Sequence, residues 1–229
     1  MKRKIIGITI LIMIVLSNSF GQEKTVKIAI VSQLDTVFTL VKNEKFVKTL
    51  DINLQEDWVS FFQTNLDSLK YEIHLISMPE EVKNNYFGKS YKYTDGILGI
   101  KASRKLSKWF DSFDYEIVIL LGRAILLYQY GFAYLNGYSY GLIIDYNCVF
   151  SVNDIYVYNT NSKKVLYHSV LNGYREYLGK LKDIDFRKEQ SDNITIDKLQ
   201  SAIEKITELN HKLGFEACEK IEKQWDKIR

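Results

Sequence analysis

Three short, mostly apolar runs stand in the first half of the chain, with helical patterns between them. The runs are Val26–Val31, Tyr71–Ile76 and Tyr115–Leu121, and all three are rich in β-branched residues. Runs of this kind predict strands that are buried on both faces, as in a parallel sheet. Apolar residues at helical spacing over 54–69 and 97–110 predict the two crossover helices. The order strand-helix-strand-helix-strand predicts a parallel βαβαβ core.

The start of the first helix has a local signal. Asn53 and Glu56 have the spacing of a capping box, which predicts that Asn53 caps the helix. Pro79 closes the second strand, and the polar residues 80–96 predict a long loop.

The pattern changes after Gly122. Tyr138–Val152, Ile155–Tyr158 and Val165–Val170 predict further strands. The turn-forming residues Asn159–Ser162 between the last two predict an antiparallel β-hairpin.

A long amphipathic helix is predicted at the end of the chain. Its apolar stripe runs from Leu199 to Trp225, and Gly214 is a weak point in the middle. The fold class that we expect is a single α/β domain over residues 22–229. It has a three-strand parallel βαβαβ core extended by an antiparallel β-hairpin region and closed by this helix.

Residues 1–21 have the pattern of a secretory signal peptide. Lys2–Lys4 precede the uninterrupted apolar run Ile5–Leu16, and the small residues Ser19 and Gly21 stand before the expected cleavage point. The run is shorter than the roughly 20 residues of a membrane-spanning helix. An uncleaved amino-terminal anchor is the alternative.

The charge balance changes once this segment is removed. Three of the 31 basic residues leave with it, and the rest equal the 28 acidic ones. A balanced chain has no general attraction to nucleic acid, so we expect no nucleic-acid partner.

The positions of the two cysteines bear on where in or outside the cell the protein is located. Neither Cys148 nor Cys218 follows the apolar run, so the lipid-acceptor cysteine of a bacterial lipoprotein is missing. We expect an exported protein, periplasmic or extracellular, that is not lipid-anchored and has no integral membrane span after signal cleavage. The cysteines either pair as a disulfide in that oxidising compartment or stay free and buried.

Three stretches resemble a known group of envelope proteins. Lys27–Ser32 (KIAIVS) resembles the opening strand of the α/β domain shared by the TolB amino-terminal part and by CsgG-type envelope proteins. Asp114–Gly122 (DYEIVILLG) resembles the third strand of that domain, and Ile155–Leu166 (IYVYNTNSKKVL) is similar to its hairpin. Asn159 departs from the usual turn aspartate, and residues 123–140 are unlike the group. The resemblance implies an α/β fold and transfers no functional residue.

One motif is typical of serine hydrolases. Gly137–Gly141 matches G-x-S-x-G, with Ser139 in the nucleophile position, and Asp154 and His168 follow in the order acid, then base. That chemistry needs a helix after the serine, whereas a strand pattern follows here. The glycines therefore fit a β-hairpin strand better, and the catalytic set stays the alternative.

Metal and cofactor signals are weak. The segment 88–90 (GKS) resembles the end of a phosphate-binding loop, but Lys83 stands where the first glycine is required. His74, His168 and His211 are scattered, and the two lone cysteines offer no chelating pair. We expect no metal and no cofactor.

An aromatic segment follows the third strand and is the most unusual feature of the chain. Alternation on a hairpin would place its aromatic residues on one face, where they form core, a protein-interaction surface or a membrane contact. Arg123 stands at the carboxyl end of a parallel strand, where open α/β sheets bind ligands; an ordinary surface arginine is the alternative. The aromatic candidates are Tyr128, Tyr130, Phe132, Tyr134, Tyr138 and Tyr140.

The leading functional hypothesis is an exported, non-enzymatic accessory or binding protein of the bacterial envelope with a protein partner. The first alternative is a serine hydrolase that uses Ser139. The second is a small-ligand carrier with its pocket beside Arg123.

Overall fold

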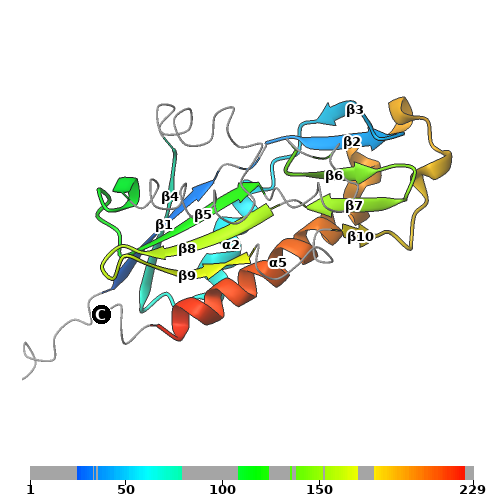
Figure 1. Cartoon of the computed structure of the whole chain (residues 1–229). Coiled ribbons are helices and arrows are strands. Elements are labelled where there is room, and N and C mark those ends of the chain that lie inside the picture. The colour runs from blue at the N-terminus through cyan, green and yellow to red at the C-terminus, as the bar shows by residue number, and fades with distance from the viewer. Residues whose placement is uncertain are drawn as a thin grey trace, which may run out of the picture.

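The chain folds into two five-stranded mixed sheets and a long C-terminal helix (Figure 1). This confirms the mixed α/β class. The predicted signal segment 1–21 lies outside the residues that the computed structural model describes. Those residues are 25–32, 34, 36–78, 108–123, 135, 138–151, 153–169 and 178–224.

The first sheet contains the three apolar runs and the predicted hairpin. Strand β1 pairs in parallel with β4 on one side and with β5 on the other, and β8 and β9 continue the sheet as an antiparallel pair. In sheet order the strands are β4 (Tyr71–Ile76), β1 (Val26–Ser32), β5 (Ile117–Arg123), β8 (Asn153–Asn159) and β9 (Lys164–His168).

The connections differ from the predicted βαβαβ order. Two strands, β2 (Phe38–Lys42) and β3 (Lys45–Leu50), come between β1 and the helix α2 (Gln55–Asn65). The second predicted helix, 97–110, lies largely outside the described residues, of which Lys108–Phe110 are helical.

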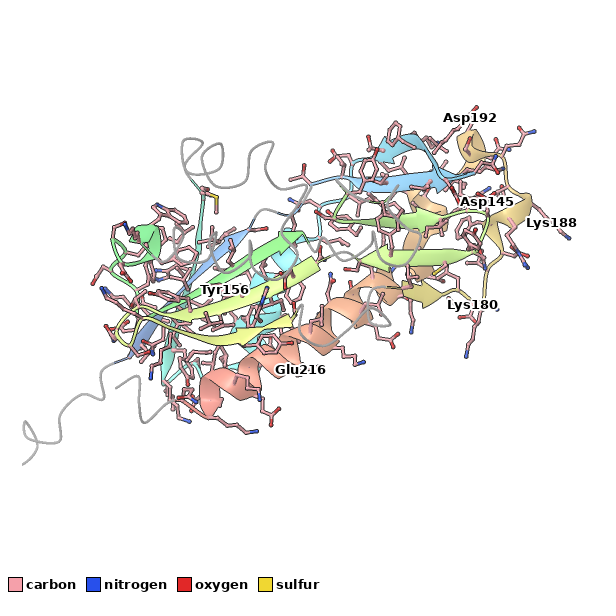
Figure 2. All side chains as sticks on the ribbon, in the orientation of Figure 1. Asp145, Tyr156, Lys180, Lys188, Asp192 and Glu216 are labelled. Atoms are coloured by element: carbon pink, nitrogen blue, oxygen red, sulfur yellow. The ribbon has the colours of Figure 1, made fainter. Side chains whose placement is uncertain are left out.

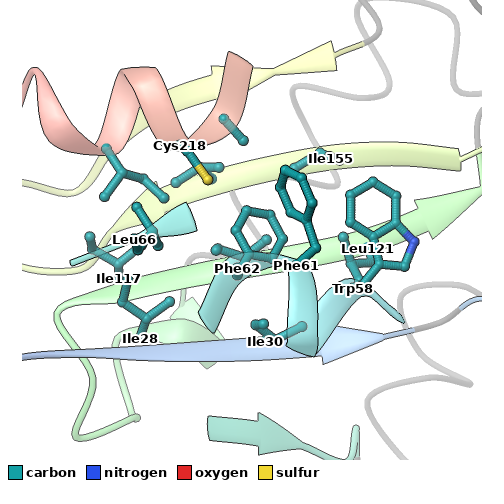
Figure 3. Packing of buried hydrophobic residues seen from close by; sticks show 14 of the residues in the cluster. Ile28, Ile30, Trp58, Phe61, Phe62, Leu66, Ile117, Leu121, Ile155 and Cys218 are labelled. Carbon is teal, nitrogen blue, oxygen red and sulfur yellow. The ribbon is translucent and has the colours of Figure 1, made fainter. Parts of the chain in front are cut away.

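The central strands β1 and β5 are buried on both faces, which explains their continuous apolar runs. On one face, α2 places Trp58, Phe61 and Phe62 over the strands (Figure 3). On the other face, Phe110 packs against Ala29, Val31, Val118, Leu120 and Tyr158. A strand between two apolar layers has no solvent-facing side, so its sequence does not alternate.

The second sheet was not predicted as such. The segment Tyr138–Val152 is not one strand: β6 and β7 are separated by a tight turn, in which Asn147 has a φ of 47°. Asparagine tolerates this left-handed conformation better than most residues. Strand β2 pairs in parallel with β6, and the other pairs are antiparallel. In sheet order the strands are β10 (Leu178–Lys180), β7 (Cys148–Ser151), β6 (Tyr140–Ile143), β2 and β3.

The Asn147 side chain holds a long segment against this sheet. Its amide donates to the carbonyls of Leu181 and Ile184, at 3.1 and 2.6 Å, and its oxygen accepts from the Phe186 N–H at 2.8 Å. Phe186 is thereby fixed in the second core.

A tertiary contact lies at the start of α2. Leu54, rather than Asn53, occupies the N-cap position, so the prediction at Asn53 is wrong. The Leu54 N–H donates to the Tyr140 hydroxyl at 3.2 Å, and that hydroxyl donates to the Ile52 carbonyl at 3.0 Å. A side chain from β6 therefore does what a local cap was expected to do.

The helix α5 (Gln200–Glu222) confirms the predicted long closing helix and serves both sheets (Figure 1). Ala202 and Ile206 belong to the core of the second sheet, whereas Ala217 and Ile221 belong to that of the first. One helix therefore ties two hydrophobic cores together.

Gly214 does not interrupt α5. A Cβ at this position would lie 2.4 Å from Cε1 of Phe61, which is buried. The glycine allows close approach of α2 rather than loosening the helix.

Candidate functional site

A stacked pair of aromatic rings, one exposed and the other partly exposed, lies at the second sheet. Phe46, on β3, is 51% exposed and stacks on Tyr138, with ring centroids 5.9 Å apart and planes 17° from parallel. Tyr138 precedes β6, so the pair joins segments far apart in the chain. The sequence analysis missed Phe46, although an aromatic residue between Lys45 and Lys48 was a usable signal.

Tyr140, two residues further on, is a core residue. It is fully buried, and its ring lies 6.4 Å from that of Phe38. Tyr138 and Tyr140 therefore have different roles. The other predicted interaction residues, Tyr128, Tyr130, Phe132 and Tyr134, lie outside the described residues.

Arg123 ends β5, where its backbone pairs with Asn153 of β8. Strands β1 and β5 both point toward the second sheet (Figure 1). The predicted position of Arg123 at the carboxyl end of a parallel strand is therefore confirmed. Its side chain lies outside the described part.

Ser139 is fully buried directly before β6. A serine nucleophile must meet its substrate, and here no surface of the residue is exposed. The second glycine of the motif has a structural reason. A Cβ at Gly141 would lie 2.0 Å from the Thr39 carbonyl oxygen and 2.8 Å from the Phe150 ring, so only glycine fits between β2 and β7.

The structure brings Asp154 and His168 together, and a third residue, Ser169, joins them. The His168 Nε2 lies 2.8 Å from Asp154 Oδ2, and the Ser169 hydroxyl donates to the other oxygen at 2.5 Å. In a serine hydrolase the imidazole lies between the hydroxyl and the carboxylate. Here the hydroxyl on the carboxylate belongs to Ser169, which is not the predicted nucleophile Ser139. This arrangement holds the end of β9 against the start of β8.

A second polar group is buried where the chain passes from β7 to β8. The Ser151 hydroxyl donates to the side-chain oxygen of Asn210 on α5, and the Asn153 amide donates to the same oxygen at 3.0 Å. All three side chains are buried, and the Asn153 Oδ1 has no hydrogen-bond partner among the described residues. The group fixes α5 at the junction of the two sheets.

Both cysteines are free thiols. Of the two alternatives left open by the sequence, the structure therefore has the unpaired one. Burial raises the pKa of Cys148 to about 11 and is the main cause that raises the pKa of Cys218 to about 12. Neither thiol has the low pKa of a reactive cysteine.

Charged side chains gather at the far end of the second sheet. Asp145, Lys188 and Asp192 all lie there (Figure 2). Close by in the chain, the Arg187 guanidinium hydrogen-bonds to Asp185 and lowers the pKa of that carboxyl to about 2. Acidic and basic groups are mixed there, so they do not form one cluster of a single sign.

Within the described ranges, no group of three or more His, Cys, Asp or Glu side chains is placed to hold a metal ion. In that same part of the chain, no helix is long and apolar enough to cross a membrane. No family model, no curated protein and no solved structure matches the chain.

Proposed function

We propose that this chain is an exported, non-enzymatic binding protein of the bacterial envelope. It holds a protein partner at the surface around Phe46 and Tyr138. The observation that carries this proposal is the stack of the exposed Phe46 ring on the partly exposed Tyr138 ring. Large aromatic side chains dominate the energy of protein interfaces, and a pair that is already stacked loses little freedom on binding.

Two further points support the proposal. Ser139 is buried, which weighs against the hydrolase alternative. The signal-peptide pattern supports export, and the resemblance to the TolB and CsgG-type domain supports the envelope. Export and that kinship are parts of the proposal.

Site-specific photocrosslinking in intact cells tests the contact. A photoreactive phenylalanine replaces Phe46 in the full chain, and in a matched control it replaces Phe215, which is equally exposed at 54% but lies on α5. We expect one dominant, saturable adduct from position 46, lost on Tyr138→Ala, and none from position 215. Equal adducts from both positions contradict the proposal.

The hydrolase alternative has its own direct test. A fluorophosphonate probe that labels the folded protein, with labelling lost in Ser139→Ala, would replace the binding function by an esterase-like one.

A further inference from the structure

Strand β3, which carries Phe46 of the aromatic pair, is an edge strand of the second sheet. Strand β3 pairs with β2 on one side, and no described strand pairs with its other side. None of its residues is buried, and Lys45, Phe46 and Thr49 are exposed. A free strand edge presents unpaired N–H and C=O groups, which can template a further strand.

The charge of β3 determines which kind of extended segment can pair with its edge. The only charged residues within β3 are Lys45 and Lys48. Lysines on an edge strand oppose pairing between two copies of the same chain, because like charges would face each other. The same lysines favour an extended segment that carries carboxylates.

The edge is also held in one conformation. Asn43 and Glu44 both have positive φ values, 51° and 57°, and form the two-residue turn that joins β2 to β3. This is the turn geometry that matches the twist of a β-hairpin. The N–H of Asn43 in this turn donates to the carboxylate of Asp145, which is far away in the chain. A pre-ordered edge lowers the entropic cost of adding a strand.

We propose that β3 binds an extended acidic segment of the partner as an added strand, with an aromatic or large apolar side chain of that segment resting on Phe46. The proposal rests on the proposed function and deepens it by naming the partner's chemistry. Backbone hydrogen bonds along β3 supply affinity, and the lysines and Phe46 supply selectivity.

The test uses protein purified from an exporting host and a short synthetic peptide of alternating valine, tyrosine and glutamate. Amide hydrogen exchange of residues 45–50 is followed with and without the peptide. We expect the outward-facing amides of β3 to exchange more slowly when the peptide is bound. The Lys45→Glu, Lys48→Glu double variant should lower peptide affinity about tenfold or more.

The matched control makes the same change in net charge, but on the opposite edge of the same sheet. Strand β10 is that edge, and Lys180→Glu, Lys182→Glu alters two exposed lysines in or beside it. We expect this variant to bind as the parent does. Equal weakening by both double variants would show non-specific attraction and overturn the proposal.

Two other outcomes also overturn it. One is peptide binding without slower exchange in β3. The other is slower exchange that depends on protein concentration alone, which would make a second copy the occupant. If the crosslink at position 46 persists while β3 is not protected, the binding function stands and only the strand-addition mode fails.

Discussion

The two sheets are encoded differently. In the first, β1, β4 and β5 are runs of six or seven residues, and β1 and β5 have apolar layers on both sides. In the second, β6 and β7 have four residues each and β10 has three. The long runs are visible in the sequence, whereas the short strands are accompanied by contacts that Asn147 and Tyr140 make to distant segments. The first sheet is specified locally and the second by tertiary structure.

This contrast does not make the two sheets independent, because α5 contributes to both cores. The test with the largest expected effect removes one large buried ring from each core. Phe62→Ala in the first core and Phe186→Ala in the second should each cost about 3–5 kcal/mol. Both should lower the free energy of the same urea-induced transition, followed by tryptophan fluorescence and by far-ultraviolet circular dichroism. Two separate transitions would show that the sheets unfold independently.

A second test concerns packing inside the second sheet. Gly141→Ala should destabilise the protein by about 1–3 kcal/mol, because the added Cβ meets the Thr39 backbone. Gly179→Ala is the control. There the nearest atom is Cγ of the Lys205 side chain at 2.8 Å rather than a backbone atom at 2.0 Å, so the cost should be smaller than at Gly141. Thermal or urea unfolding measures both, and equal costs would contradict the close contact at Gly141.

A third test concerns the buried polar group at the junction of the two sheets. Asn210→Leu removes the oxygen that accepts from Ser151 and Asn153, and should cost about 1–3 kcal/mol. The double variant with Ser151→Ala should cost less than the sum of the two single variants, since they share one bond. Full additivity in urea unfolding would mean that the buried polar group is not a unit.

The smallest expected loss of stability appears only at high pH. The folded pKa values of Cys148 and Cys218 are raised from 9.0 to about 11 and about 12, so the unfolded chain loses these protons first. Stability is therefore unaffected well below pH 9 and falls as pH rises toward the folded values, by about 1 kcal/mol per thiol near pH 10. Comparing urea unfolding of the parent with a Cys148→Ala, Cys218→Ala variant across this range isolates the thiols. Identical slopes would contradict their burial.

The candidate site shows where sequence reasoning stops. Tyr138 was a predicted interaction residue and is partly exposed, but Tyr140, which shares its pattern, is in the core. Alternation applies only within a strand, and Tyr138 lies before the start of β6, which the sequence pattern did not indicate. Asp154 and His168 were paired correctly, yet the order of donors and acceptors around Asp154 could be seen only in the fold.

By itself the sequence determined the strands of the first sheet, the β8–β9 hairpin and the closing helix. Each depends on a local pattern of apolar residues, which remains visible whatever the rest of the chain does. Only the tertiary structure decided the second sheet, the burial of Ser139 and the stacking of Phe46 on Tyr138. These features join segments far apart in the chain. Their free energy comes from contacts that no single segment contains.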